Sequence, residues 1–458
     1  MKCCWKPRPA AATSWSWCGR RIGSHIHVSN SKLAHSQCRN LTYHSRSSDR
    51  DRPTNEPHQR PTSALPALAC LAVALATCEF IRRLGSARLP ASRFVTIDGL
   101  RGYLAFFVFL HHSSIWYYYL KDGLWQLPPS RLYAHFGQTS VALFFMVTGF
   151  LFAHKLLHSR GTPIRWLDVY ASRIARLLPA YLLAMALLFL LVFTATGFSL
   201  REAPSALLGK MLDWLLFSIP SKPDMNGFIG TFRIVAGVTW TLPYEWLFYF
   251  CLPFLGVLLG NRPSPVAMAI MAGMIWLVLK AWQPNWTLAY MFVAGGLSAL
   301  AVRSTHLQRF AASIPGNLLC LALLLLPGVL FPSAYQETAI LILGLAFLLI
   351  AAGSSLFGLL TQALSRFLGE MTYSMYLLHG CILFISFELL IGRDNAKAFS
   401  ALEHWLVIGA ITPLVVLASY LSFRFIESPA MQRSRQLSAL LGKPMLALKR
   451  LGRHPTAG

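Results

Sequence analysis

Two residues that can perform acid-base chemistry share one apolar stretch of the chain. Arg101 and His112 are eleven positions apart, and on an α-helix this spacing returns to within about 20° of the same face after a rise of about 16 Å. Histidine titrates near neutrality, so a neutral His112 inside an apolar bundle suits a general base. The alternative is a packing histidine that hydrogen-bonds a neighbouring helix. We predict that His112 is catalytic and that Arg101 holds a substrate or stabilises developing charge.

Three further polar residues interrupt apolar stretches. Glu245 ends the segment that begins at Trp240; it can orient His112, pair with an arginine, or cap a proline-bent helix. Tyr376 and His379 are three positions apart, so they lie on one helix face. For this pair, a role in hydrogen-bonded packing is the alternative to a role in the site. Ionisable groups inside membrane segments usually mark function, so we predict that Glu245 belongs to the catalytic site.

Arg173 and Arg176 come just before another apolar stretch, also three positions apart. Guanidinium groups match the geometry of phosphate groups. The pair is therefore a candidate site for the phosphates of a nucleotide-containing ligand such as coenzyme A. The alternative is that both arginines anchor a helix at the cytoplasmic surface of a membrane.

The composition excludes most soluble proteins. Of the 458 residues 55% are hydrophobic and 13% charged, whereas soluble domains carry about 25% charged residues. The net charge of +24 is compatible with nucleic-acid binding, but the basic residues lie between apolar runs, which is the pattern of a membrane protein. The cysteines lack the spacing of metal ligands. We therefore predict a partner lipid bilayer, no nucleic acid and no metal.

The chain is predicted to be all-α, a polytopic integral membrane helical bundle with about ten transmembrane helices. An apolar stretch at 64–78, ended by Glu79, is short enough to be only a marginal eleventh. The ten windows are 102–120, 138–154, 177–196, 238–260, 264–279, 286–302, 314–331, 338–353, 373–392 and 402–423.

Charge and composition divide the chain into four parts. Residues 1–60 are read as a disordered basic leader, although their composition also fits an organelle transit peptide. Residues 61–96 hold the marginal apolar segment and a linker, 97–429 the transmembrane domain, and 430–458 a basic tail. Lys and Arg concentrate in alternate loops and in the tail, so the C-terminus is predicted to be cytoplasmic, in a multi-pass protein of the inner (plasma) membrane.

Together the motifs resemble the membrane-bound acyltransferase 3 family, over about 97–429. No single motif is specific to this family, but the order of the motifs along the chain is. The matching segments are DGLRG at 98–102 with His112, LFFMVTGFL at 143–151, RIAR at 173–176, WTLPYE at 240–245 with Phe248 and Tyr249, YSMY at 373–376 with His379, and YLSFRFIESP at 420–429.

The resemblance implies an O-acyltransferase that moves an acyl group, in the simplest case acetyl, from acyl-CoA to a hydroxyl of a carbohydrate such as a cell-surface polysaccharide or a secreted glycan. The family's arginine and histidine pattern falls on Arg101 and His112, and its paired arginines fall on Arg173 and Arg176. Substrate-binding or supporting roles are expected for a further set: Asp98, Trp240, Tyr373, Tyr376 and His379.

Two positions depart from the family's pattern. Ala142 stands where the family usually has an aspartate, and Trp246 with Leu247 stand where it often has a polar pair. A less polar site is implied, which leaves the acceptor open. The acyl group and the oligomeric state are open as well, as is the choice between direct transfer and a covalent acyl-histidine relay.

The rival hypothesis is a proton-coupled polytopic transporter. His112, His379 and Glu245 would then form its proton pathway. The two halves of the sequence show no internal repeat of the kind that many transporters have, which favours the enzyme.

Overall fold

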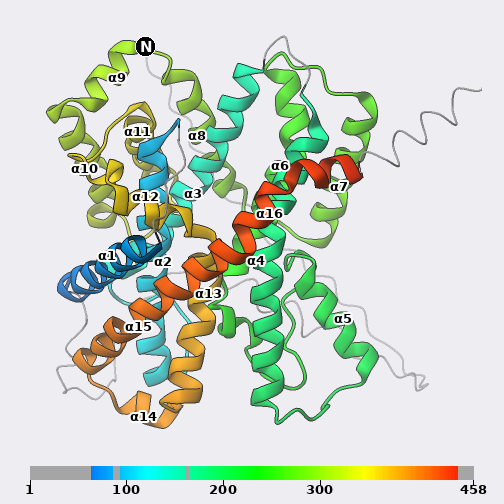
Figure 1. The fold of residues 1–458 in the computed structure, drawn as a ribbon, viewed down its shortest axis with the longest axis vertical. Helices are drawn as coiled ribbons and strands as arrows, with labels where there is room; N and C mark the ends of the chain where they lie inside the picture. Colours follow the sequence, from blue (N-terminus) through cyan, green and yellow to red (C-terminus); the bar gives the residue numbers. More distant parts are fainter. Residues whose placement is uncertain (1–62, 86–92, 160–163, 442–458) are drawn as a thin grey trace, which may run out of the picture. The chain divides into compact units, whose positions relative to one another are not determined.

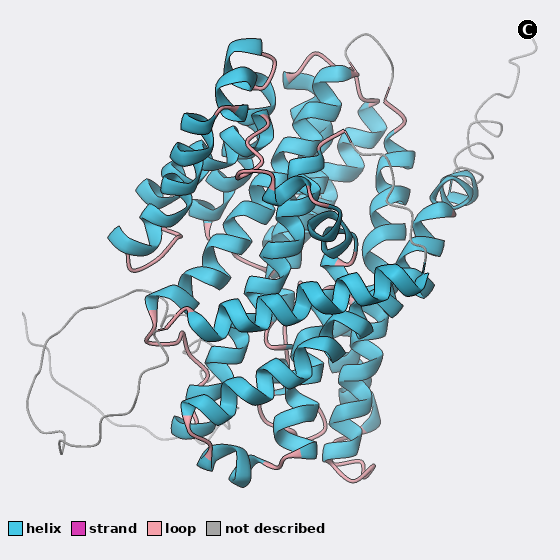
Figure 2. Ribbon diagram, turned by 60° about the vertical axis from the view of Figure 1, so that its left-hand side comes forward, coloured by secondary structure: helices cyan, strands magenta, loops and turns pink. Residues whose placement is uncertain are grey.

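The computed structural model describes residues 63–85, 93–159 and 164–441. Figure 2 shows these residues as helices joined by loops, so the all-α prediction is confirmed. Within the described residues, extended pairing is limited to an isolated bridge between Met225 and Phe228. The predicted leader lies outside the described residues, as does the part of the tail after residue 441.

The α-helices are α1 (Leu65–Gly85), α2 (Val95–Asp122), α3 (Arg131–His158), α4 (Trp166–Ala195), α5 (Pro204–Leu215), α6 (Leu242–Leu258), α7 (Pro265–Ala281), α8 (Ala289–Ala301), α9 (Thr305–Ala312), α10 (Ile314–Leu330), α11 (Glu337–Ala352), α12 (Ala363–Glu370), α13 (Thr372–Phe384), α14 (Arg393–Ala398), α15 (Ala401–Ser422) and α16 (Ser428–Gln432). Tighter or wider turns add η1 (Thr231–Val235), η2 (Val238–Thr241), η3 (Trp286–Leu288), η4 (Leu359–Thr361), η5 (Ile385–Leu390) and η6 (Phe423–Glu427).

Six helices of the described chain are long and apolar enough to cross a membrane, or seven if one bent pair is a single span. All ten predicted windows are helical, but ten spans are not confirmed. The helices α7, α10 and α11 have 17, 17 and 16 residues, fewer than the roughly 20 that a straight span needs. The six are Leu65–Leu84, Arg131–His158, Trp166–Ala195, Val238–Leu258, Thr372–Leu390 and Ala401–Gln432.

The segment predicted to be marginal is a full helix. We expected the apolar stretch to end at Glu79, but α1 continues to Gly85. Glu79 is accommodated because it pairs with Arg82 at 2.8 Å and with Arg83 at 2.6 Å, one helical turn further on. The stretch is therefore among the six helices that are long and apolar enough to span.

Helix α2 is the element around which the candidate site is built. It packs against α3, α12 and α13, and most of its residues are buried. It carries Arg101, His111 and His112, and it is not among the six apolar helices. Neighbouring helices rather than lipid surround it, which explains why so polar a helix is tolerated in an apolar bundle.

Glycines let two helix pairs approach closely. A Cβ added to Gly102 on α2 would lie 2.7 Å from the backbone nitrogen of Gly369 on α12, and one added to Gly369 would lie 2.0 Å from the Asp98 carbonyl oxygen. On the other side of the molecule a Cβ on Gly295 of α8 would lie 1.9 Å from the Met146 carbonyl oxygen of α3. The DGLRG motif therefore has a packing role, because small residues permit such contacts between membrane helices.

The last long helix packs against α13 and α4. Residues Ala401–Gln432 run continuously through α15, η6 and α16. Figure 1 shows this helix, orange to red, passing across α13 and α4, and both pairs are in contact. The π-helical turn η6 faces α4, so the closing motif of the sequence lies beside the helix that carries Arg173 and Arg176.

The glycine contact between α3 and α8 can be tested with neighbouring residues. We expect Gly295→Ala to lower the thermal midpoint of the detergent-solubilised protein by the equivalent of about 1–3 kcal/mol, the usual cost of overpacking. Gly296→Ala is the matched control, because its added Cβ would meet an atom no closer than 3.8 Å. Equal midpoints for the two variants would contradict the close packing of α3 on α8.

Candidate active site

The structure brings His112 and His379 into contact. His112 lies on α2 and His379 on α13, and His112 Nδ1 is 3.1 Å from His379 Nε2. Their rings have centroids 5.1 Å apart. His379 is fully buried. We predicted a catalytic role for His112 and a supporting role for His379, and the two side chains form a hydrogen-bonded pair in the structure.

Two backbone carbonyls decide which ring nitrogens carry protons. His379 Nδ1 is 2.9 Å from the Met375 oxygen, so it must donate, because a carbonyl only accepts. The Nε2 of a neutral His379 is then an acceptor. His112 Nδ1 faces that acceptor and also the Val108 oxygen at 3.0 Å, so it carries a proton as well. This network assigns the proton positions, and in a neutral His112 ring it leaves Nε2 unprotonated, which is the form a general base needs.

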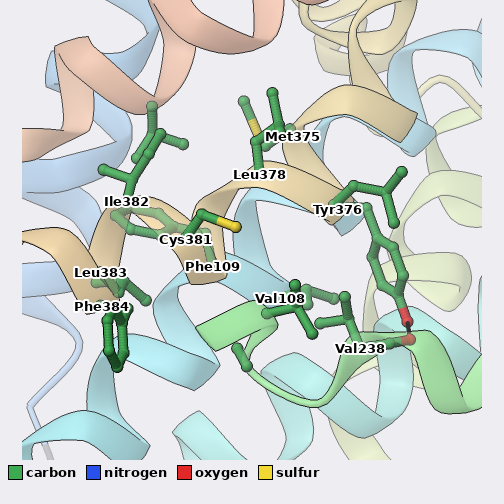
Figure 3. Packing of buried hydrophobic residues seen from close by; sticks show 14 of the residues in the cluster. Val108, Phe109, Val238, Met375, Tyr376, Leu378, Cys381, Ile382, Leu383 and Phe384 are labelled. Carbon is green, nitrogen blue, oxygen red and sulfur yellow. Dashed lines mark hydrogen bonds between the residues drawn. The ribbon is translucent and has the colours of Figure 1, made fainter. Parts of the chain in front are cut away.

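Tyr376 links the histidine pair to a neighbouring cavity. Its hydroxyl is 2.9 Å from Thr241 Oγ1 and donates to the Val238 carbonyl oxygen at 3.0 Å, which Figure 3 shows from close by. The Tyr376 ring lies one turn from His379, with ring centroids 6.5 Å apart. Because Tyr376 and Thr241 both line the cavity, the histidine pair lies immediately beyond this wall.

The cavity has a volume of about 160 Å³ and unites most of the residues singled out in the sequence. Helices α2, α3, α4, α6 and α13 contribute to its wall. His112, His379, Asp98 and Trp240 are not among its lining residues. The predicted residues that line it are Arg101, Arg173, Arg176, Glu245, Tyr373 and Tyr376.

Glu245 faces arginines rather than the histidine pair. Its carboxylate accepts a 2.9 Å hydrogen bond from the Tyr249 hydroxyl, and the charges of Arg173, Arg176 and Arg101 act on it. The Arg173 guanidinium also lies over the Phe152 ring, 5.3 Å from its centroid. Glu245 lies in the first turn of α6 and is hydrogen-bonded to Tyr249, while His379 rather than Glu245 lies beside His112.

Asp98 and Arg101 lie together near the start of α2. Arg101 Nη1 is 4.0 Å from Asp98 Oδ1, and the Arg101 side chain is 17% exposed. The Glu370 carboxylate, which ends α12, also interacts with the charge of Arg101. Asp98 thus supports Arg101 instead of lining the cavity.

One buried carboxylate near the candidate site was not predicted to be a site residue. Glu427 is 1% exposed, accepts a hydrogen bond from Ser374 on α13, and interacts with the charge of Arg176. The sequence does point to Glu427, because the residue lies in the closing motif, but the residue itself follows the last apolar window. Tyr249 stands in the motif around Glu245 but was given no site role, since a tyrosine in an aromatic segment is indistinguishable from a packing residue.

The remaining predicted residues have packing roles in the structure. Trp240 meets the rings of Tyr244 and Tyr335 edge-on, at 6.0 and 6.3 Å between centroids. Ala142 is fully buried, and Trp246 packs against Tyr249. The positions that depart from the family's pattern therefore contribute apolar surface around the site.

Most of this chain is similar to a known protein family. Residues 94–424, well over half of the chain, match the model of a family described as an acyltransferase domain. A stretch of 103 residues is 35% identical to Protein 2 in picA locus from Rhizobium radiobacter; it makes up 22% of this chain and 46% of that protein, so the chain spans about half of that relative's length. No solved structure matches the chain. None of these findings supports the transporter hypothesis.

The buried carboxylate Glu427 offers a test of the charge cluster. We expect Glu427→Ala to lower the thermal midpoint by the equivalent of about 1–3 kcal/mol, because the buried Ser374 hydroxyl loses its acceptor and the partly buried Arg176 loses part of its compensating charge. Glu337→Gln, at an exposed carboxylate of α11, is the control and should stay near the wild type. A Glu427→Ala protein as stable as that control would show that Glu427 does not balance the arginines.

Proposed function

The chain belongs to the acyltransferase 3 family and is thus a membrane acyltransferase, and on that premise we propose that it transfers an acyl group from acyl-CoA to a hydroxyl of a carbohydrate. One observation carries the proposal: the hydrogen bonds of the His112 and His379 pair leave His112 Nε2 unprotonated. Such a nitrogen can deprotonate a hydroxyl that is about to attack a thioester.

In the proposed reaction, His112 Nε2 takes the proton of the acceptor hydroxyl. The hydroxyl oxygen forms a bond to the thioester carbonyl carbon, the bond between that carbon and sulfur breaks, and the leaving CoA sulfur takes the proton from His112. A relay uses the same Nε2 atom as nucleophile and forms an acyl-histidine first. Both routes need the same histidine in the same protonation state.

The cavity beyond Tyr376 carries positive charge. Arg101, Arg173 and Arg176 line it, and preorganised cations near a developing oxyanion lower the barrier of acyl transfer. We propose that Arg173 and Arg176 hold the donor and that Arg101 acts on the developing charge. The volume of about 160 Å³ suits the reacting end of a donor rather than a whole nucleotide.

The proposed sidedness follows from the distribution of basic residues. Lys and Arg concentrate in alternate loops and in the tail, so we propose that Arg173, Arg176 and the C-terminus face the cytoplasm of a cell whose inner (plasma) membrane holds the protein. The acyl donor would then enter from the cytoplasmic side. The acetyl group is the simplest donor group, and a cell-surface or secreted glycan is the proposed acceptor.

The role of His112 is tested by acyl transfer in membranes. With labelled acetyl-CoA and a polysaccharide extract, we expect His112→Ala to lose at least about 100-fold in CoA release and label transfer, the usual contribution of a general base. His306→Ala, at an exposed histidine of α9, serves as the control at matched expression. Unchanged transfer by His112→Ala would overturn the base assignment, and no CoA release from the wild type with any acyl-CoA would overturn the proposed function.

His379 is a positioning residue in this scheme. Replacing it by alanine removes the acceptor that orients His112 Nδ1, so we expect kcat to fall about 100-fold while KM for the donor changes little. His379→Gln retains a carbonyl acceptor on its side chain and should recover part of kcat. Equal loss in the alanine and glutamine variants, or a change confined to KM, would contradict the orienting hydrogen bond.

A further inference from the structure

A basic cleft lies where α2 begins and α3 ends. Its volume is about 570 Å³, and it is distinct from the cavity of the candidate site, with which it shares no lining residue. Its lining residues within the described part of the chain include no acidic side chain. The lining residues that carry the argument are Arg93, Val95, Thr96, His154, His158 and Arg303.

Two arginines and two imidazoles line this cleft, and no carboxylate of the described residues is among its lining residues. Arg93 Nη2 is 3.4 Å from His158 Nε2, and the rings of His154 and His158 stack with centroids 3.9 Å apart. Arg93 and Arg303 are exposed, and neither forms an ion pair with an acidic residue of the described chain. The other arginines near α2 differ in this respect, since the Arg101 charge faces Asp98 and Glu370.

The backbone adds donors at the same place. Val95 and Thr96 are the first residues of α2, and the first N–H groups of a helix have no acceptor within it. The positive end of the helix dipole therefore points toward the cleft. A site with two guanidinium groups, two imidazoles and a helix start suits an anion whose oxygens are arranged around one centre.

We propose that this basic cleft binds a phosphate group of an anionic ligand. Arginine forks recognise phosphate with two parallel hydrogen bonds. Arg93 lies just before α2, Arg303 lies in the turn between α8 and α9, and both line the cleft. Phosphate groups reach such a cleft from two sources: the nucleotide part of acyl-CoA and the headgroup of an anionic lipid.

The cleft lies close to the candidate site along two shared helices. On α2, Val95 and Arg101 are six positions apart, a rise of about 9 Å. On α3, Leu151 lines the cavity and His154 lines the cleft, three positions further on. If the proposed function holds, a donor with its phosphates in the cleft can extend its thioester end toward Arg101. That reading rests on the proposed function, whereas the phosphate site does not.

Binding without turnover tests the phosphate site. The full chain, purified in a neutral detergent, is titrated with adenosine 3′,5′-bisphosphate, which carries phosphate groups of the kind found in coenzyme A. In a second arm, lipids retained from nanodiscs of phosphatidylglycerol or of phosphatidylcholine are identified by native mass spectrometry. The variants are Arg93→Gln combined with Arg303→Gln, and Arg309→Gln as the control, an exposed arginine of α9 that does not line the cleft.

We expect the double variant to bind one probe at least about tenfold more weakly, or to lose the retained phosphatidylglycerol, while Arg309→Gln matches the wild type. An effect on the nucleotide identifies the donor as the ligand, and an effect on phosphatidylglycerol identifies a lipid headgroup. The proposal is overturned if the wild type binds neither probe, or if the double variant binds both as the wild type does. Neither outcome depends on acyl transfer, so the proposed function is tested separately.

Discussion

A backbone carbonyl can only accept a hydrogen bond, and this constraint determines the chemistry of the candidate site. The Met375 oxygen requires a proton on His379 Nδ1, and the resulting acceptor at His379 Nε2 faces His112 Nδ1. His112 Nε2 is thereby left unprotonated. Helices α2 and α13 hold these two rings in contact, and glycine contacts bring α12 against the same helix α2.

The second requirement is electrostatic. Three arginines line one cavity in an apolar bundle, and the cost of burying such charges is large unless carboxylates and hydrogen bonds compensate it. Glu245, Glu370 and Glu427 come from three different helical segments to meet this need. The arginines and the carboxylates therefore come together only where these helical segments pack against one another.

Sequence reasoning found most of the parts but not their partners. The apolar windows located the helices, and the motifs indicated six of the residues that line the cavity. The sequence did not reveal that His379 rather than Glu245 contacts His112, because this contact joins residues 267 positions apart. Helix α1 was underestimated because the ion pairs of Glu79 are visible only on a helix. Glu427 was passed over because its burial depends on how η6 packs against α4 and α13. Periodicity and hydropathy describe single helices, whereas these features arise between helices.

The protonation state of the His112 ring can be observed directly. The measurement is the ¹⁵N spectrum of the ring nitrogens in protein labelled at histidine, with the His112 signals identified by their loss in His112→Gln. We expect a neutral His112 ring that carries its proton on Nδ1 and has no proton on Nε2. A His112 ring that carries its proton on Nε2, or on both nitrogens near neutral pH, would contradict it.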